Sequence, residues 1–174
     1  MIDYIFLSGV HGSGKSTLSK KIKEKINIDY VSVSDLIRRA GKSISSHNKS
    51  TTDIDINQNL WKNELNKIES KQKLFLLDGH FCLLNRNNEL EILPENTFDG
   101  TSMTKIILVT NTAETICSRL QVRDNKNYPV SLIQKFIETE EKQAHRLSQI
   151  NEIPLFVYND KEPFDELLNF LTET

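Results

Sequence analysis

One eight-residue segment near the start constrains this chain more than any other: Gly9-Val10-His11-Gly12-Ser13-Gly14-Lys15-Ser16. It fits the pattern G-x-x-x-x-G-K-[ST] without a gap, and average residue usage puts a chance match in a chain of this length on the order of 1%. The match lies between a strand-like apolar segment, Ile2–Ser8, and a helix expected over Ser16–Ile26. Glycines in that position allow backbone N–H groups to surround a polyphosphate, and the helix N-terminus adds a positive dipole. The pattern therefore predicts a phosphate-binding loop rather than a simple glycine turn.

The residue types in this loop predict their individual roles. Lys15 is expected to reach the β- and γ-phosphates of ATP, and the hydroxyl of Ser16 is expected to ligate Mg²⁺. His11 occupies a variable position of the loop, where it either packs or lies at the surface. The full set of predicted ATP-binding residues is Gly9, His11, Gly12, Ser13, Gly14, Lys15, Ser16, Thr17 and Arg119.

A second acidic position belongs with the loop. The apolar strand predicted at Leu74–Leu77 is followed directly by Asp78, and open parallel sheets bind ligands at the carboxyl ends of their strands. We therefore expect Asp78 to hold Mg²⁺ directly or through water, although Asp-Gly is also a common turn pair. His80 follows two residues later; it either contacts the reacting phosphates or packs as an ordinary loop histidine.

Strand-like and helix-like segments alternate along the chain, without repeats. Further strands are expected at Tyr30–Val33, Lys105–Thr110 and Leu155–Tyr158. Further helices are expected at Asp35–Ala40 with Ser34 as its cap, at Asp53–Ser70, from Asn111 to Val122, from Ser131 to Gln149, and at Glu162–Leu171. This alternation predicts an α/β fold of three layers, with a five-stranded parallel sheet covered by helices on both faces.

Composition narrows the possible classes of protein. A length of 174 residues suits one domain, and 37% hydrophobic residues with a net charge of −2 argue against disorder and against a polycationic nucleic-acid binder. Cys82 and Cys117 cannot by themselves form a disulfide framework or a four-ligand zinc site. No apolar run has the length of a membrane span, and no signal-peptide layout is present. The expectation is a cytoplasmic domain that does not associate with membranes.

Arginine is scarce in this sequence, at six residues against 16 lysines. A planar, permanently charged guanidinium suits phosphate clamping, so each arginine is a candidate. Arg38 follows the second strand, where an acceptor would bind, whereas Arg119 and Arg123 lie at the end of the fourth helix, near the donor phosphates. A solvated surface charge is the better interpretation of Arg39.

These segments together resemble the P-loop nucleoside-monophosphate kinases of the adenylate kinase superfamily. Val31-Ser32-Val33-Ser34-Asp35-Leu36-Ile37-Arg38 resembles the family segment that holds the acceptor phosphate, and Ser118-Arg119-Leu120-Gln121-Val122-Arg123 resembles the entry to the lid. The resemblance implies a single kinase domain over 1–174, with an acceptor-binding insert at 41–70 and a short lid at 119–130. It implies acceptor contacts for Asp35 and Arg38, and catalytic roles for Lys15, Asp78, Arg119 and Arg123.

The chain also departs from the family. Adenylate kinases commonly continue Asp-Gly with Phe-Pro-Arg, whereas this sequence has His80-Phe81-Cys82, so only Arg86 is near enough to replace the second acceptor arginine. A short lid and a histidine after the strand-end aspartate look more like the archaeal-type enzymes and the adenylate kinase/ATPase branch. His80 and Arg86 are therefore further acceptor candidates.

The expected activity is Mg²⁺-dependent phosphoryl transfer from ATP to a small phosphorylated acceptor, in the first place a nucleoside monophosphate. Two alternatives remain at this point: an ATPase switch coupled to a macromolecular partner, and a kinase of a non-nucleotide metabolite such as a sugar acid. Nucleic acid is an improbable ligand because no basic stripe with interleaved aromatic residues is present. The sequence does not indicate the oligomeric state.

Overall fold

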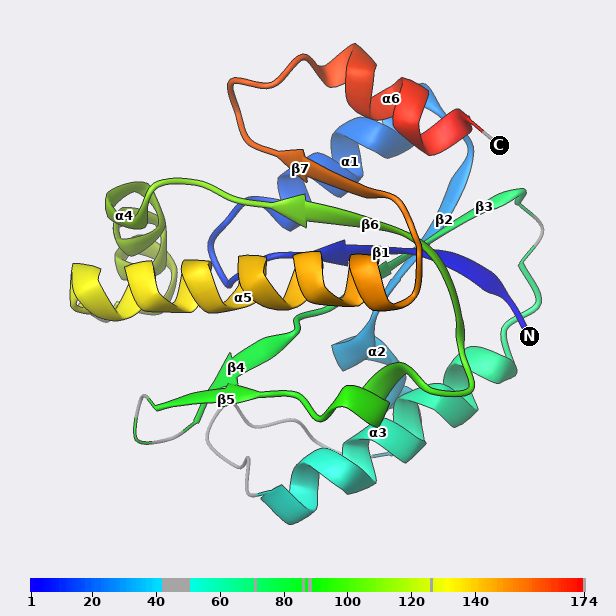
Figure 1. The fold of residues 1–174 in the computed structure, drawn as a ribbon, viewed down its shortest axis with the longest axis horizontal. Helices are drawn as coiled ribbons and strands as arrows, with labels where there is room; N and C mark the ends of the chain where they lie inside the picture. The colour runs from blue at the N-terminus through cyan, green and yellow to red at the C-terminus, as the bar shows by residue number, and fades with distance from the viewer. Residues whose placement is uncertain (42–50, 71, 86, 88, 126, 174) are drawn as a thin grey trace.

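The apolar strands assemble into one parallel sheet in the computed structural model, which describes residues 1–41, 51–70, 72–85, 87, 89–125 and 127–173 (Figure 1). Its strands, in spatial order, are β2 (Ile28–Ser32), β3 (Leu74–Asp78), β1 (Asp3–Ser8), β6 (Ser102–Val109) and β7 (Leu155–Tyr158). Every neighbouring pair is parallel. The predicted five-stranded parallel sheet is therefore confirmed.

Helices cover both faces of this sheet. They are α1 (Lys15–Lys25), α2 (Val33–Arg39), α3 (Thr51–Asn66), α4 (Ala113–Asp124), α5 (Val130–Ile150) and α6 (Phe164–Thr172). Side chains of β1 alternate, so Tyr4 and Phe6 pack toward α2, α3 and α5, whereas Ile5 and Leu7 pack toward α1 and α6. Figure 1 shows the resulting three layers. In the described part of the chain, no helix has both the length and the apolar character needed to cross a membrane.

The three N-caps predicted from the sequence are wrong. The cap of α2 is Ser32 rather than Ser34, because the hydroxyl oxygen of Ser32 accepts the backbone N–H of Asp35 at 3.0 Å. The cap of α4 is Thr112 rather than Asn111, since Thr112 accepts the N–H of Thr115. Helix α5 begins directly after Pro129, so the predicted capping role of Ser131 is wrong. Helix α5 has no side-chain cap hydrogen bond, so the S-x-x-Q spacing alone does not mark its start.

No hydrophobic periodicity predicts the structure of the segment between β3 and β6, because its helix and strands are short. It forms an antiparallel hairpin of β4 (Cys82–Leu84) and β5 (Leu90–Ile92), followed by the 3₁₀ helix η1 (Glu95–Phe98). The rings of Phe81 and Phe98 lie 4.9 and 5.0 Å from the ring of Phe6. These contacts fix the hairpin and η1 against the same face of the sheet as α3.

The carboxyl ends of the three strands β2, β3 and β1 lie side by side. Asp78, the last residue of β3, pairs in register with Ser32 of β2 and with Leu7 of β1. Loops that leave these strands therefore meet at one edge of the sheet, which is where parallel sheets bind ligands.

Candidate active site

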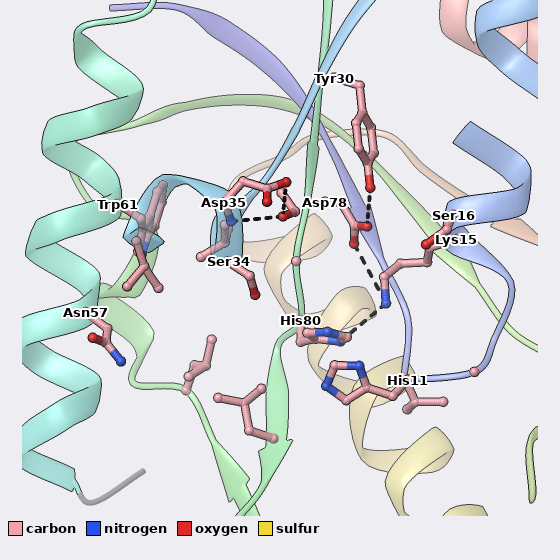
Figure 2. A pocket seen from close by; sticks show the side chains of 18 of the residues that line it. His11, Lys15, Ser16, Tyr30, Ser34, Asp35, Asn57, Trp61, Asp78 and His80 are labelled. Carbon is pink, nitrogen blue, oxygen red and sulfur yellow. Dashed lines mark hydrogen bonds and ion pairs between the residues drawn. The ribbon is translucent and has the colours of Figure 1, made fainter. Parts of the chain in front are cut away.

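A cavity of about 590 Å³ opens at this edge (Figure 2). The phosphate loop forms one wall, the ends of β2 and β3 form the floor, and α3 with the β4–β5 hairpin and η1 forms the opposite wall. Figure 2 shows Lys15, Ser16 and His80 on one side and Asn57 with Trp61 on the other. A volume of this size is typical of sites for small ligands.

The loop from Gly9 to Gly14 adopts the tight turn that the sequence predicts. Gly9 has φ 143°, and a Cβ atom there would lie 2.3 Å from the carbonyl oxygen of Val109, so only glycine fits. Gly14 has φ 115° and caps α1, with its carbonyl accepting the N–H groups of Thr17 and Leu18. The N-terminus of α1 therefore faces the cavity in the geometry that binds anions.

Lys15 points into the cavity and is only 7% exposed. Its ammonium group donates to the carbonyl oxygen of Gly9 and lies 3.8 Å from the Oδ1 atom of Asp78. Burial lowers the pKa of Lys15, while the carboxylates of Asp78 and Glu140 oppose that shift. The fold thus places a buried lysine beside the carboxylate of Asp78 at the centre of the site.

Asp78 occupies the position expected of a magnesium ligand. Its Oδ2 atom accepts a hydrogen bond of 2.7 Å from the hydroxyl of Tyr30, and burial raises the pKa of Asp78 while the Lys15 charge opposes the rise. Asp78 and Ser16 line the same cavity, and both supply oxygen atoms. Among the described residues no three His, Cys, Asp or Glu side chains gather as a metal cage. This donor set fits Mg²⁺, which in nucleotide sites takes one or two protein oxygens and completes its shell with phosphates and water.

His80 lies over the phosphate loop. Its Nδ1 atom is 2.7 Å from the carbonyl oxygen of Gly9 and 3.4 Å from the ammonium of Lys15. Because a carbonyl only accepts hydrogen bonds, Nδ1 is the protonated nitrogen in this contact. The exposed His11 ring lies 4.2 Å from the His80 ring, centre to centre. The structure thus places His80 beside Lys15 and the phosphate loop, and its contact with reacting phosphates stays a prediction.

The arginines predicted for the site differ in whether they line the cavity. Arg119 and Arg123 line the cavity, and Arg119 also donates to the carbonyl oxygens of Gly12 and Ser13 and to Asp160. Arg38 is exposed and forms an ion pair with Asp35; Asp35 lines the cavity, whereas Arg38 is not among the described residues that do.

Three predicted features lie wholly or partly outside the described residues: Arg86, residues 42–50 of the predicted insert 41–70, and residue 126 of the predicted lid 119–130.

Glu140 is a site residue that the sequence reasoning missed. It is 1% exposed on α5, and its carboxylate accepts hydrogen bonds from the backbone of Gly9, Phe81 and Cys82. Its neighbours on the buried stripe of α5 are apolar, namely Ile133, Phe136, Ile137 and Ala144. An acid at a core position of an otherwise apolar stripe is the signal that could have identified it.

The wall opposite the phosphate loop was also missed. Three polar atoms there are buried without a hydrogen-bond partner among the described residues: Oδ1 of Asn57, Nε2 of Gln58 and Oγ1 of Thr97. Trp61 is buried and also lines the cavity. Val33, Ile37, Leu83 and Leu93 add apolar surface to the cavity, whose lining also includes Ser34 and Asp35. Buried polar atoms normally have partners, so these atoms indicate a ligand.

A family model described as "AAA domain" matches residues 8–135, most of the chain. The chain belongs to this AAA domain family. A protein named UMP-CMP kinase 2 from Caenorhabditis elegans is 29% identical over 159 residues, covering 83% of this chain and 80% of that protein. A gluconokinase structure from Sinorhizobium meliloti 1021 aligns with TM-score 0.52 and 16% identity, covering 96% of this chain and 87% of that one.

These similarities agree with the fold and with the cavity described above. The structural alignment covers nearly the whole α/β fold, and the family match includes the phosphate loop, Asp78 and the arginines of α4. The predicted resemblance to P-loop nucleoside-monophosphate kinases is confirmed.

Proposed function

We propose that this protein transfers the γ-phosphoryl group of Mg-ATP to a nucleoside monophosphate. On the donor side, the loop N–H groups and Arg119 hold the phosphates, while Lys15 and Arg123 stabilise charge on the transferring group. Ser16 and Asp78 would hold Mg²⁺, which supplies further charge neutralisation at the phosphate oxygens. In-line positioning then provides most of the catalysis, because phosphoryl transfer requires little covalent chemistry from the protein.

The observation that carries the acceptor assignment is the chemistry of the wall opposite the phosphate loop. It combines apolar surface with two amides and one hydroxyl, and within the described part of the chain Oδ1 of Asn57, Nε2 of Gln58 and Oγ1 of Thr97 have no hydrogen-bond partner. Amide groups match the mixed donors and acceptors on the edge of a nucleobase. A flat heterocycle with few polar groups would satisfy these atoms and fill the apolar space.

A sugar acid fits this wall less well. Its many hydroxyls would face apolar side chains such as Val33, Ile37, Leu83 and Leu93, and buried hydroxyls without partners are costly.

Product chromatography tests this proposal. The protein is incubated with Mg-ATP alone, with each common nucleoside monophosphate, and with gluconate. ADP together with a matching nucleoside diphosphate is the expected result. Equal ADP release whatever is added would overturn the proposal in favour of the ATPase alternative, and ADP formed only with gluconate would identify a sugar-acid kinase.

Asn57→Ala is expected to raise the KM for the acceptor about tenfold, because a hydrogen bond to the base is lost, with a free energy of about 1.4 kcal/mol. The KM for ATP should change less than twofold. Asn59→Ala is the matched control, since Asn59 is exposed on the same helix. Steady-state kinetics with the acceptor varied provide the measurement. An equal rise of both Michaelis constants would show that Asn57 does not read the acceptor.

Arg38→Ala is expected to weaken acceptor use because the guanidinium, released from Asp35, would clamp the acceptor phosphate. We expect the acceptor KM to rise by roughly tenfold or more, as for loss of a charged hydrogen bond. Arg39→Ala is the neighbouring control, also exposed. If the two variants behave alike, the acceptor role of Arg38 is wrong.

A further inference from the structure

We infer that Glu140 is a positioning residue, whose carboxylate holds the start of the phosphate loop and the backbone beside His80 in one fixed register. The inference rests on the donor half of the proposed function and does not depend on the identity of the acceptor. Glu140, a buried acid that lies far from the phosphate loop in the sequence, would thereby contribute to the reaction.

The contacts of Glu140 come from two separate segments, the end of β1 with the start of the phosphate loop, and the loop between β3 and β4 with the start of β4. At the end of β1, the Ser8 hydroxyl donates to Oε1 at 2.5 Å, and the N–H of Gly9 donates at 3.1 Å. From the loop after β3, the N–H of Phe81 lies 3.0 Å from both oxygens. The N–H and the thiol of Cys82 donate to Oε2 at 2.9 and 3.1 Å. One carboxylate thus ties together residues that are more than 70 positions apart.

Both segments carry groups of the candidate active site. Gly9 begins the phosphate loop, and its carbonyl accepts from Lys15 and from His80. Phe81 directly follows His80 in the chain. Glu140 therefore fixes the backbone at both ends of the His80–Gly9 hydrogen bond, and through Gly9 it also fixes the acceptor of the Lys15 ammonium.

A carboxylate suits this position better than an amide. All five donor groups point toward Glu140, and an ionised carboxylate has only accepting atoms, so no donor is left unmatched. A glutamine would place an NH₂ group against backbone N–H groups, because only one of its terminal atoms accepts. Replacement of Glu140 by glutamine therefore keeps the volume of the side chain but leaves some of the donor groups without an accepting atom.

The test compares Glu140→Gln with Glu138→Gln, an exposed position on the same helix. Thermal unfolding and ATP binding are measured first, followed by steady-state kinetics with acceptor and by basal ATP hydrolysis without it. We expect Glu140→Gln to unfold cooperatively, to lower kcat by 10- to 100-fold in both reactions, and to change the acceptor KM less than threefold. Glu138→Gln should match the parent protein. Basal hydrolysis keeps this test valid even if the acceptor is not a nucleotide.

A double-mutant cycle separates positioning from simple structural support. If Glu140 acts through His80, Glu140→Gln should cost much less kcat in a His80→Ala background than in the parent protein. Additive losses, or a folded Glu140→Gln protein with parental kcat, would overturn the inference.

Two milder variants keep the inference testable if Glu140→Gln does not fold. Ser8→Ala and Cys82→Ala each remove one side-chain donor to the carboxylate, and each is expected to lower kcat two- to fivefold. Parental kcat in both would likewise overturn the inference.

Discussion

Lys15→Ala is expected to lower kcat by at least about 10³-fold, or about 4 kcal/mol of transition-state stabilisation, while the protein stays folded. Lys15 is the buried cation of the phosphate loop, held by Gly9 and facing Asp78. Alanine removes the charge that would follow the transferring phosphoryl group. The fold should survive because the Lys15 side chain lines the cavity, so water can replace its ammonium beside Asp78.

Kinetics and thermal unfolding are measured on the same preparation, with Lys20→Ala as control. Lys20 is exposed on the same helix, so its removal tests the loss of a lysine without the loss of the site. A folded Lys15→Ala protein with more than a tenth of the parental kcat would refute the phosphate-loop mechanism.

Asp78→Asn is expected to lower kcat at least about 10²-fold and to raise the Mg²⁺ concentration needed for half-maximal rate. Asparagine keeps the shape of the side chain, and its oxygen can still accept the hydrogen bond from Tyr30. The charge that attracts the metal is lost, so the defect should lie in metal use rather than in folding.

The measurement is a titration of activity with Mg²⁺ at fixed ATP, and Asp99→Asn, at an exposed position, serves as control. Partial recovery of kcat at high Mg²⁺ would support the assignment. An unchanged Mg²⁺ dependence together with low activity would show that Asp78 acts on Lys15 alone.

The features predicted well from the sequence are those encoded by neighbours in the chain. The loop from Gly9 to Ser16 and the strand ending at Asp78 each have a local pattern with a physical meaning. Their convergence followed from the rule that parallel strands end at one edge, and the register of Leu7 with Asp78 confirms it. The placement of helices on both faces followed from the alternating apolar segments.

The missed features depend on contacts between distant residues. Glu140 meets Ser8 across 132 positions of sequence, and nothing local to α5 says which loops that carboxylate will meet. Asn57 and Thr97 come to one wall of the cavity only after the β4–β5 hairpin packs on the sheet. Short strands such as β4 give too few residues for a periodic pattern.

Trp61 also has a practical consequence. It is the single tryptophan of the chain, is 2% exposed and lies on the cavity wall beside Asn57. Indole emission depends on the polarity and contacts around the ring, so a ligand that fills this end of the cavity must alter the fluorescence of the whole protein. The fluorescence of Trp61 can therefore report ligand binding, and acceptor candidates can be ranked by titration without a label, a coupled enzyme or turnover.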